Sequence, residues 1–84
     1  MDDDTPHIAL TPRMRRTMQN AARIAEARGH TWIGTEHVLL ALLDDPDGIA
    51  GSAIRRLGFE PALREAVESV LGSLGYRSSS SELP

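Results

Sequence analysis

Residues 29–43 read Gly-His-Thr-Trp-Ile-Gly-Thr-Glu-His-Val-Leu-Leu-Ala-Leu-Leu, and this stretch decides how the chain can fold. A polar turn that contains two glycines passes directly into six consecutive apolar residues, Val38 to Leu43. A helix that is apolar all round needs cover on several sides, because one neighbour hides only one stripe of it. We therefore expect other helices of this chain, or a second copy of it, to pack around this segment.

The sequence before this stretch predicts a long amphipathic helix. Thr11 and Pro12 form a helix start, because a threonine side chain caps free backbone N–H groups and proline fits the first turn. One apolar stripe follows at helical spacing, made of Met14, Met18, Ala21, Ala22 and Ala25. Gly29 is expected to end the helix in the left-handed conformation.

Three further helices are expected in the rest of the chain. Thr35 is the expected cap of the second helix, and Glu36 lies in its first turn, where a negative charge suits the helix dipole. A third helix should span about residues 49–57 and be closed by Gly58, with an inner face of Ile49, Ala50, Ala53, Ile54 and Leu57. Pro61 should open a fourth, with an inner face of Leu63, Val67, Val70, Leu71 and Leu74.

The two ends of the chain differ in composition from its middle. Residues 1–9 contain three consecutive aspartates and are predicted to form a mobile acidic arm, and the serine-rich residues 75–84 a disordered tail. Residues 10–74 show no strand-like alternation and no internal repeat. The expected fold class is therefore all-α, with four helices in one compact unit.

The composition argues against several classes of function. All nine basic residues are arginine, so the lysine-containing phosphate loop of an ATPase is absent, and without cysteine there is neither a thiol nucleophile nor a thiolate metal site. The three histidines do not have the spacing of a structural zinc site. We expect no catalytic activity, no metal and no cofactor. No apolar run approaches the length of a membrane span, and we expect a cytoplasmic protein.

Several short motifs occur in the order and at the spacing of a known family: Leu10-Thr11-Pro12-Arg13, Gly29-His30, Ile33-Gly34-Thr35-Glu36-His37, Leu57-Gly58 and Val70-Leu71-Gly72. Over about residues 8–72 the chain thereby resembles the Clp N-terminal domain found at the front of ClpA-, ClpB- and ClpC-type unfoldases. The opening Thr-Pro-Arg is most similar to the second repeat of a ClpC-type domain. The usual domain of that family has two such repeats, and this chain has room for one.

The resemblance implies a non-catalytic protein-binding module without the motor of the unfoldases. Its expected partners are substrate proteins, degrons or adaptors of a Clp protease system, or the unfoldase itself. In ClpC-type domains the acidic residue of the motif helps to bind the guanidinium of phosphorylated arginine, and the threonine that opens the first helix lies near the phosphate. The matching positions here are Glu36 and Thr11. Because a lone repeat lacks its companion, we also expect a two-fold homodimer that imitates the pair.

The candidate partner-binding residues are Thr11, Arg13, Trp32, Thr35, Glu36 and His37. Arg13 is included because it lies in the first helical turn, where it can reach a phosphate bound near Thr11. Trp32 is either an anchor for a partner or a plug for the domain's own core, and the sequence leaves both open. His37 belongs to the same motif, although it can instead form a local hydrogen bond in the first turn of the second helix.

The basic first helix supports an alternative interpretation. It carries most of the arginines of the chain, at positions 13, 15, 16, 23 and 28, as a small DNA-binding regulatory protein would. The net charge of −3 opposes that interpretation, and such a run is usually a solvated helix face. We therefore expect no nucleic-acid partner and keep DNA binding as the alternative.

Overall fold

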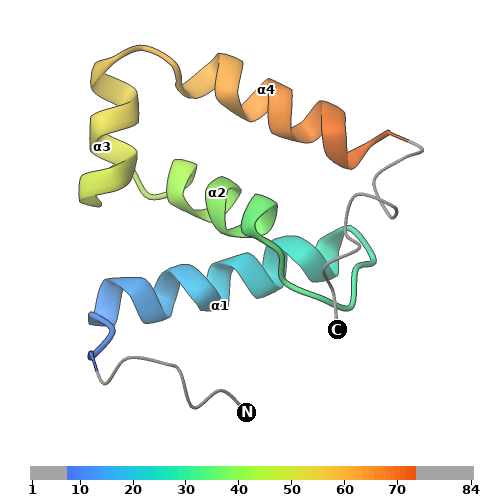
Figure 1. Cartoon of the computed structure of the whole chain (residues 1–84), viewed down its shortest axis with the longest axis horizontal. Helices are drawn as coiled ribbons and strands as arrows, with labels where there is room; N and C mark the ends of the chain where they lie inside the picture. The colour runs from blue at the N-terminus through green and yellow to red at the C-terminus, as the bar shows by residue number, and fades with distance from the viewer. Residues whose placement is uncertain (1–7, 74–84) are drawn as a thin grey trace.

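The computed structural model describes residues 8–73 and shows four α-helices, with no strand in this part of the chain (Figure 1). The helices are α1 (Pro12–Ala27), α2 (Thr35–Leu43), α3 (Ile49–Arg56) and α4 (Glu60–Leu71). The predicted all-α, four-helix fold class is confirmed. Most of the predicted acidic arm, the predicted tail and Leu74 lie outside the described residues.

Helix α1 begins and ends as its sequence predicts. The hydroxyl of Thr11 accepts a hydrogen bond of 3.0 Å from the backbone N–H of Met14, so it caps the helix. Gly29 follows the last turn with φ of 75°, a conformation that costs glycine little and other residues more. Gly58 has the same φ and ends α3 in the same way.

Helix α2 begins one residue earlier than predicted, and the prediction that Thr35 caps it is wrong. Gly34 is the N-cap residue, and Thr35 is the first residue of the helix. The backbone N–H of Gly34 donates a 2.8 Å hydrogen bond to Nδ1 of His37, which supplies one half of a capping box. A Cβ at Gly34 would lie 2.5 Å from both carboxylate oxygens of Glu36. The helix start is therefore set by two side chains inside the helix, which a search for capping residues does not detect.

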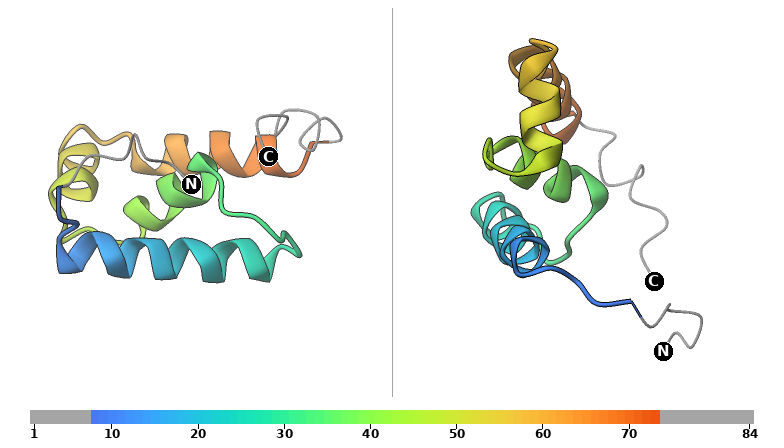
Figure 2. Two further views of the ribbon diagram at one scale, coloured as in Figure 1. Left: turned by 60° about the horizontal axis from the view of Figure 1, so that its bottom comes forward. Right: turned by 90° about the vertical axis from the view of Figure 1, so that its left-hand side faces the viewer.

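Helix α2 is the centre of the fold, as its apolar sequence requires. In Figures 1 and 2, α1 runs along one side of α2, α4 lies on the other, and α3 joins α2 to α4 at one end. The core residues of the described chain come from α1 and α2 alone: Ala21, Ala25, Leu40, Ala41 and Leu43. The hydroxyl of the buried Thr17 is satisfied by a 2.9 Å bond to the carbonyl of Arg13.

Helix α3 is rotated away from the predicted orientation: of its five predicted inner residues only Ile54 is half-buried, and the other four are exposed. Its one buried residue is Gly51, at which an added Cβ would lie 2.4 Å from the carbonyl oxygen of Asp45. The helix thus approaches the end of α2 backbone to backbone, which only the glycine side allows. Ile49 and Leu57, expected inside, lie on the other side and are 91% and 67% exposed.

Helix α4 covers α2 only in part. Leu63, Val67 and Leu71 are half-buried as expected, but Val70 is exposed, and no residue of α4 is fully buried. The helix is also held by ion pairs, since Arg64 contacts Asp44 at 2.8 Å.

Candidate functional site

The candidate residues gather at two places, and the first is the start of α1. One guanidinium nitrogen of Arg13 lies 2.7 and 2.8 Å from the two carboxylate oxygens of Asp45. This hydrogen bond, with the charge of Asp45, raises the pKa of Arg13 above its ordinary value. A groove of about 380 Å³ opens here, lined by Thr11, Arg13, Met14 and Ile49 among others. Arg13 therefore already has a partner, and a ligand phosphate would compete with Asp45 for it.

The second place is the loop between α1 and α2, where two histidines and the tryptophan meet. His30 Nδ1 and His37 Nε2 are 2.9 Å apart, within hydrogen-bond distance. The ring of Trp32 stacks on that of His30 with 4.9 Å between ring centroids. Trp32 is half-buried, so it covers the histidine pair and keeps part of its surface in solvent.

The hydrogen bonds of His37 determine its protonation. Its side chain is fully buried, and burial lowers its pKa below the ordinary value. Nδ1 accepts the N–H of Gly34, so in the neutral ring the proton is on Nε2, which then donates to Nδ1 of His30. His37 is therefore a neutral structural link between the loop and α2. His37 could affect a partner only indirectly, by positioning the loop between α1 and α2.

Glu36 and Thr35 lie beside a second groove, between the start of α2 and α4. It measures about 490 Å³ and is lined by Thr35, Glu36, Leu39, Ala66, Val67 and Val70. Thr35 is exposed, whereas Glu36 folds back over Gly34 with its side chain 24% exposed. Its carboxylate oxygen lies 3.9 Å from Nδ1 of His37. The groove is thus apolar along its floor and carries a carboxylate at one edge.

The structure does not bring Thr11 and Glu36 together. The pair Arg13–Asp45 joins the start of α1 to the end of α2, and the pair His30–His37 joins the end of α1 to the start of α2. The two helices are therefore antiparallel (Figure 1). The nine residues of α2 place its two ends about 13 Å apart. Thr11 and Arg13 lie at one end of this length, and Trp32, Thr35, Glu36 and His37 at the other.

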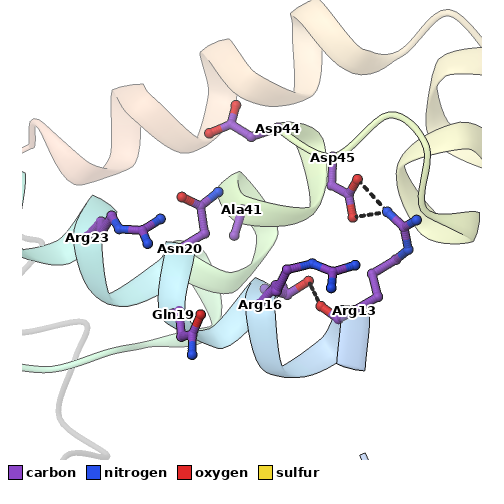
Figure 3. A pocket seen from close by; sticks show the side chains of 9 residues that line it. Arg13, Arg16, Gln19, Asn20, Arg23, Ala41, Asp44 and Asp45 are labelled. Carbon is purple, nitrogen blue, oxygen red and sulfur yellow. Dashed lines mark hydrogen bonds and ion pairs between the residues drawn. The ribbon is translucent and has the colours of Figure 1, made fainter. Parts of the chain in front are cut away.

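The sequence analysis missed two features of these surfaces. The pairing of Asp45 with Arg13 was not predicted, because nothing local indicates that it pairs with a residue 32 positions away. A groove of about 250 Å³ along the middle of α1 was also missed; Arg16, Gln19, Asn20 and Arg23 line it (Figure 3). Their spacing of three, four and seven residues was a signal that they share one face of the helix.

The sequence places the chain in a known family. The Clp repeat (R) N-terminal domain matches residues 9–84, and the chain belongs to this family. It is 33% identical over 86 residues to "Chaperone protein ClpC, chloroplastic" of Pisum sativum, covering 92% of this chain. It is 34% identical over 85 residues to "Chaperone protein ClpC1, chloroplastic" of Arabidopsis thaliana, again over 92% of the chain. "Chaperone protein ClpB" of Oceanobacillus iheyensis is 35% identical over 75 residues, 89% of the chain.

The chain spans about 9% of the length of these relatives, so it corresponds to one small part of them. No solved structure matches it. Within residues 8–73, no helix is both long and apolar enough to cross a bilayer. In the same part of the chain, no three histidine or acidic side chains are placed to hold a metal ion.

Proposed function

We propose that this chain is a non-catalytic binding module of a Clp protease system, acting in the cytoplasm on substrate proteins, degrons or adaptors. One observation carries the proposal: a single repeat leaves large apolar side chains in solvent at both ends of the α1–α2 hairpin. At the Thr11 end, Leu10 is 53% and Ile49 is 91% exposed, and at the Glu36 end Val70 is 53% exposed. Exposed apolar surface of this kind usually marks an interface.

A second copy of the chain is the first partner that we propose for these edges. In a two-fold dimer, the edge around Ile49 of one copy packs against the edge around Val70 of the other, and the reverse contact follows by symmetry. Sedimentation velocity at micromolar concentration should then show a dimer. Ile49→Asp and Val70→Asp should each weaken it about tenfold or more, because each removes a buried side chain from the interface.

Phe59 provides the matched control for this experiment. It is 60% exposed in the turn between α3 and α4, away from both edges, so Phe59→Asp should leave the dimer intact. A wild-type chain that sediments as a monomer would remove the dimer from the proposal and leave the binding of other proteins to be tested. That test is affinity capture from native cytosol, with recovery of a Clp unfoldase, its adaptors or arginine-phosphorylated proteins as the supporting result.

Phosphorylated arginine is the specific degron that we propose, and its chemistry requires the dimer. The phosphoryl group is bonded directly to a guanidinium nitrogen, so groups that bind the two must be neighbours. Thr11 and Glu36 of one copy are separated by the length of α2, and a single copy does not offer such a site. The first turn of α1 contains no acidic residue, so its free N–H groups suit a phosphate. We propose that Glu36 of the other copy supplies the carboxylate for the guanidinium.

Mixing two inactive variants tests this shared site. Thr11→Asp keeps a capping side chain but repels phosphate, and Glu36→Ala removes the carboxylate. Calorimetry should detect no binding of free phosphoarginine by either variant alone. In an equal mixture, half of the dimers are mixed and each has one intact site, so about a quarter of the wild-type sites should return. Wild-type heat with no recovery in the mixture would mean that the site is not shared, and no heat in the wild type would exclude phosphoarginine.

A further inference from the structure

The groove along the middle of α1 has no role in the proposals above. Its α1 wall is lined by Arg13, Arg16, Thr17, Gln19, Asn20 and Arg23, and Figure 3 shows Asn20 between Arg16 and Arg23. The facing wall carries carboxylates from the end of α2 and contains Ala41 deeper in the groove. It lies apart from Glu36 and Trp32, neither of which lines it.

The carboxylates of the facing wall are already neutralised. Asp45 is bound by Arg13 at 2.7 and 2.8 Å. Asp44 is bound by Arg64 of α4 at 2.8 Å. Both aspartates are therefore already paired within the domain, with Arg13 and Arg64, and neither pairs with Arg16 or Arg23.

The other two arginines of the α1 wall, Arg16 and Arg23, have no partner in the described part of the chain. Neither Arg16 nor Arg23 forms an ion pair with a carboxylate of residues 8–73. The side-chain amides of Gln19 and Asn20 form no hydrogen bond within these residues either. Two guanidinium groups and two amides therefore share one face of α1 with their hydrogen-bonding capacity directed to solvent.

We propose that this groove binds an extended acidic segment of a partner protein, with one carboxylate at Arg16 and a second at Arg23. The two arginines are seven residues apart on a helix, which is about 10.5 Å along its axis. Three residues of an extended chain in the polyproline II conformation span about 9.3 Å and complete one turn, so acidic residues at positions i and i+3 lie on one face and nearly match this spacing. Each guanidinium can form a forked pair with its carboxylate, and the amides of Gln19 and Asn20 can bond the backbone between them.

Nucleic acid fits the same groove less well. Two phosphate contacts would give a salt slope of only about −1.8, whereas DNA-binding proteins commonly make 6–10 such contacts. The net charge of −3 also opposes binding of a continuous phosphate backbone. An acidic peptide carries its charges only at the two positions that match the arginines.

Fluorescence anisotropy with a designed peptide tests the proposal. The probe is a labelled glycine–serine peptide with two aspartates three residues apart, and its control has asparagines in their place. Each exposed charged pair contributes up to about fivefold in affinity, so Arg16→Gln with Arg23→Gln should weaken binding several-fold, by up to about 25-fold. Arg55→Gln with Arg56→Gln removes the same charge from α3, where both arginines are exposed and form no ion pair within residues 8–73, and should change binding by less than about twofold.

Exchanging the charges of the two arginines and of the peptide tests whether the peptide contacts Arg16 and Arg23 directly. The variant Arg16→Glu with Arg23→Glu should reject the acidic peptide and bind the same peptide with arginines at the two positions. Circular dichroism should show unchanged helix content, because both residues are exposed. Equal losses in the α1 and α3 variants, or no gain for the exchanged pair, would overturn the proposal.

Two competing occupants are tested in the same assay. Tighter binding of a DNA duplex than of the peptide by the wild-type chain would assign the groove to nucleic acid and overturn the proposal. Tighter peptide binding after removal of residues 1–7 would mean that the chain's own aspartates at positions 2–4 occupy the groove, which also overturns it. The assay does not involve Glu36 or Thr11, so its result is independent of the phosphoarginine experiment.

Discussion

The first two helices and the last two differ in how far they hide their apolar side chains. Every buried side chain of the described residues belongs to α1 or α2: Thr17, Ala21, Ala25, His37, Leu40, Ala41 and Leu43. Helix α3 contributes only Gly51 to the buried set, and α4 contributes nothing. The α1–α2 hairpin is therefore the folding core, and the α3–α4 pair is a cover that rests on one side of it.

This difference predicts that the two halves open at different free energies. Segments with few buried apolar contacts open at a lower free energy than the core, and such segments commonly carry binding sites. Here the α3–α4 pair carries exposed Ile49, Leu57, Phe59 and Val70, and ion pairs help to hold α4 in place. We therefore expect the cover to open at a lower free energy than the hairpin.

The largest expected effect comes from the core of the hairpin. Leu40 is 1% exposed, and Leu40→Ala should lower the free energy of unfolding by about 2–5 kcal/mol, because it removes buried methyl groups and leaves a cavity. Leu63→Ala, at a half-buried position of α4, should cost only about 1 kcal/mol. Urea unfolding followed by the fluorescence of Trp32 measures both. Equal losses would show that α4 is as deeply buried in solution as α2.

A second effect should appear where the two halves meet. At Gly51 an added Cβ would lie 2.4 Å from the carbonyl of Asp45 and 2.7 Å from that of Leu42. Gly51→Ala should therefore push α3 away from α2 and lower the free energy of unfolding by about 1–3 kcal/mol. Gly72→Ala is the control, since its Cβ would meet the nearest atom at an ordinary 3.5 Å. If Gly51→Ala were as mild as the control, the close approach of the two backbones would be wrong.

The ends of the helices could be predicted from the sequence better than the direction in which each helix faces. The caps at Thr11, Gly29 and Gly58 were predictable, because they depend on neighbouring residues and on glycine's access to positive φ. The stripe of Ile49 and Leu57 was recognisable as a stripe, but periodicity does not indicate which side of a helix faces the core.

The candidate site shows the same limit. Matching of short motifs identified Thr11 and Glu36, but it carries no information about the antiparallel packing that separates them by the length of α2. The ion pair of Arg13 with Asp45 joins residues 32 positions apart, for which one sequence gives no signal. The start of α2 was misplaced by one residue because His37 reaches back to Gly34 from inside the helix.

Acid should weaken the core hairpin through His37. Burial lowers the pKa of this residue in the folded state, whereas in the unfolded chain it takes up a proton near pH 6.5. The free energy of unfolding should therefore fall as pH decreases through about 6.5, by at most about 1.4 kcal/mol per pH unit for one proton. Urea unfolding between about pH 7.5 and 5.5 measures this slope. His37→Gln should be less stable at neutral pH but show a flatter slope, and an unchanged slope would assign the proton to another group.

The smallest effect should come from the ion pair that fastens the cover to the hairpin. Arg28, at the end of α1, lies 2.5 Å from a carboxylate oxygen of Glu68 on α4, and both side chains are partly exposed. A double-mutant cycle of Arg28→Gln and Glu68→Gln should give a coupling of about 0.2–1 kcal/mol, since solvent screens such pairs. Hydrogen exchange should quicken in α4 and stay unchanged in α1 and α2, because the buried core that holds α1 and α2 together does not include this ion pair. Glu65→Gln removes the same charge from α4 at a residue without an ion pair, and it should alter neither measurement. Exchange that quickened equally in all four helices would mean that the chain opens as one unit, and the division into core and cover would not hold.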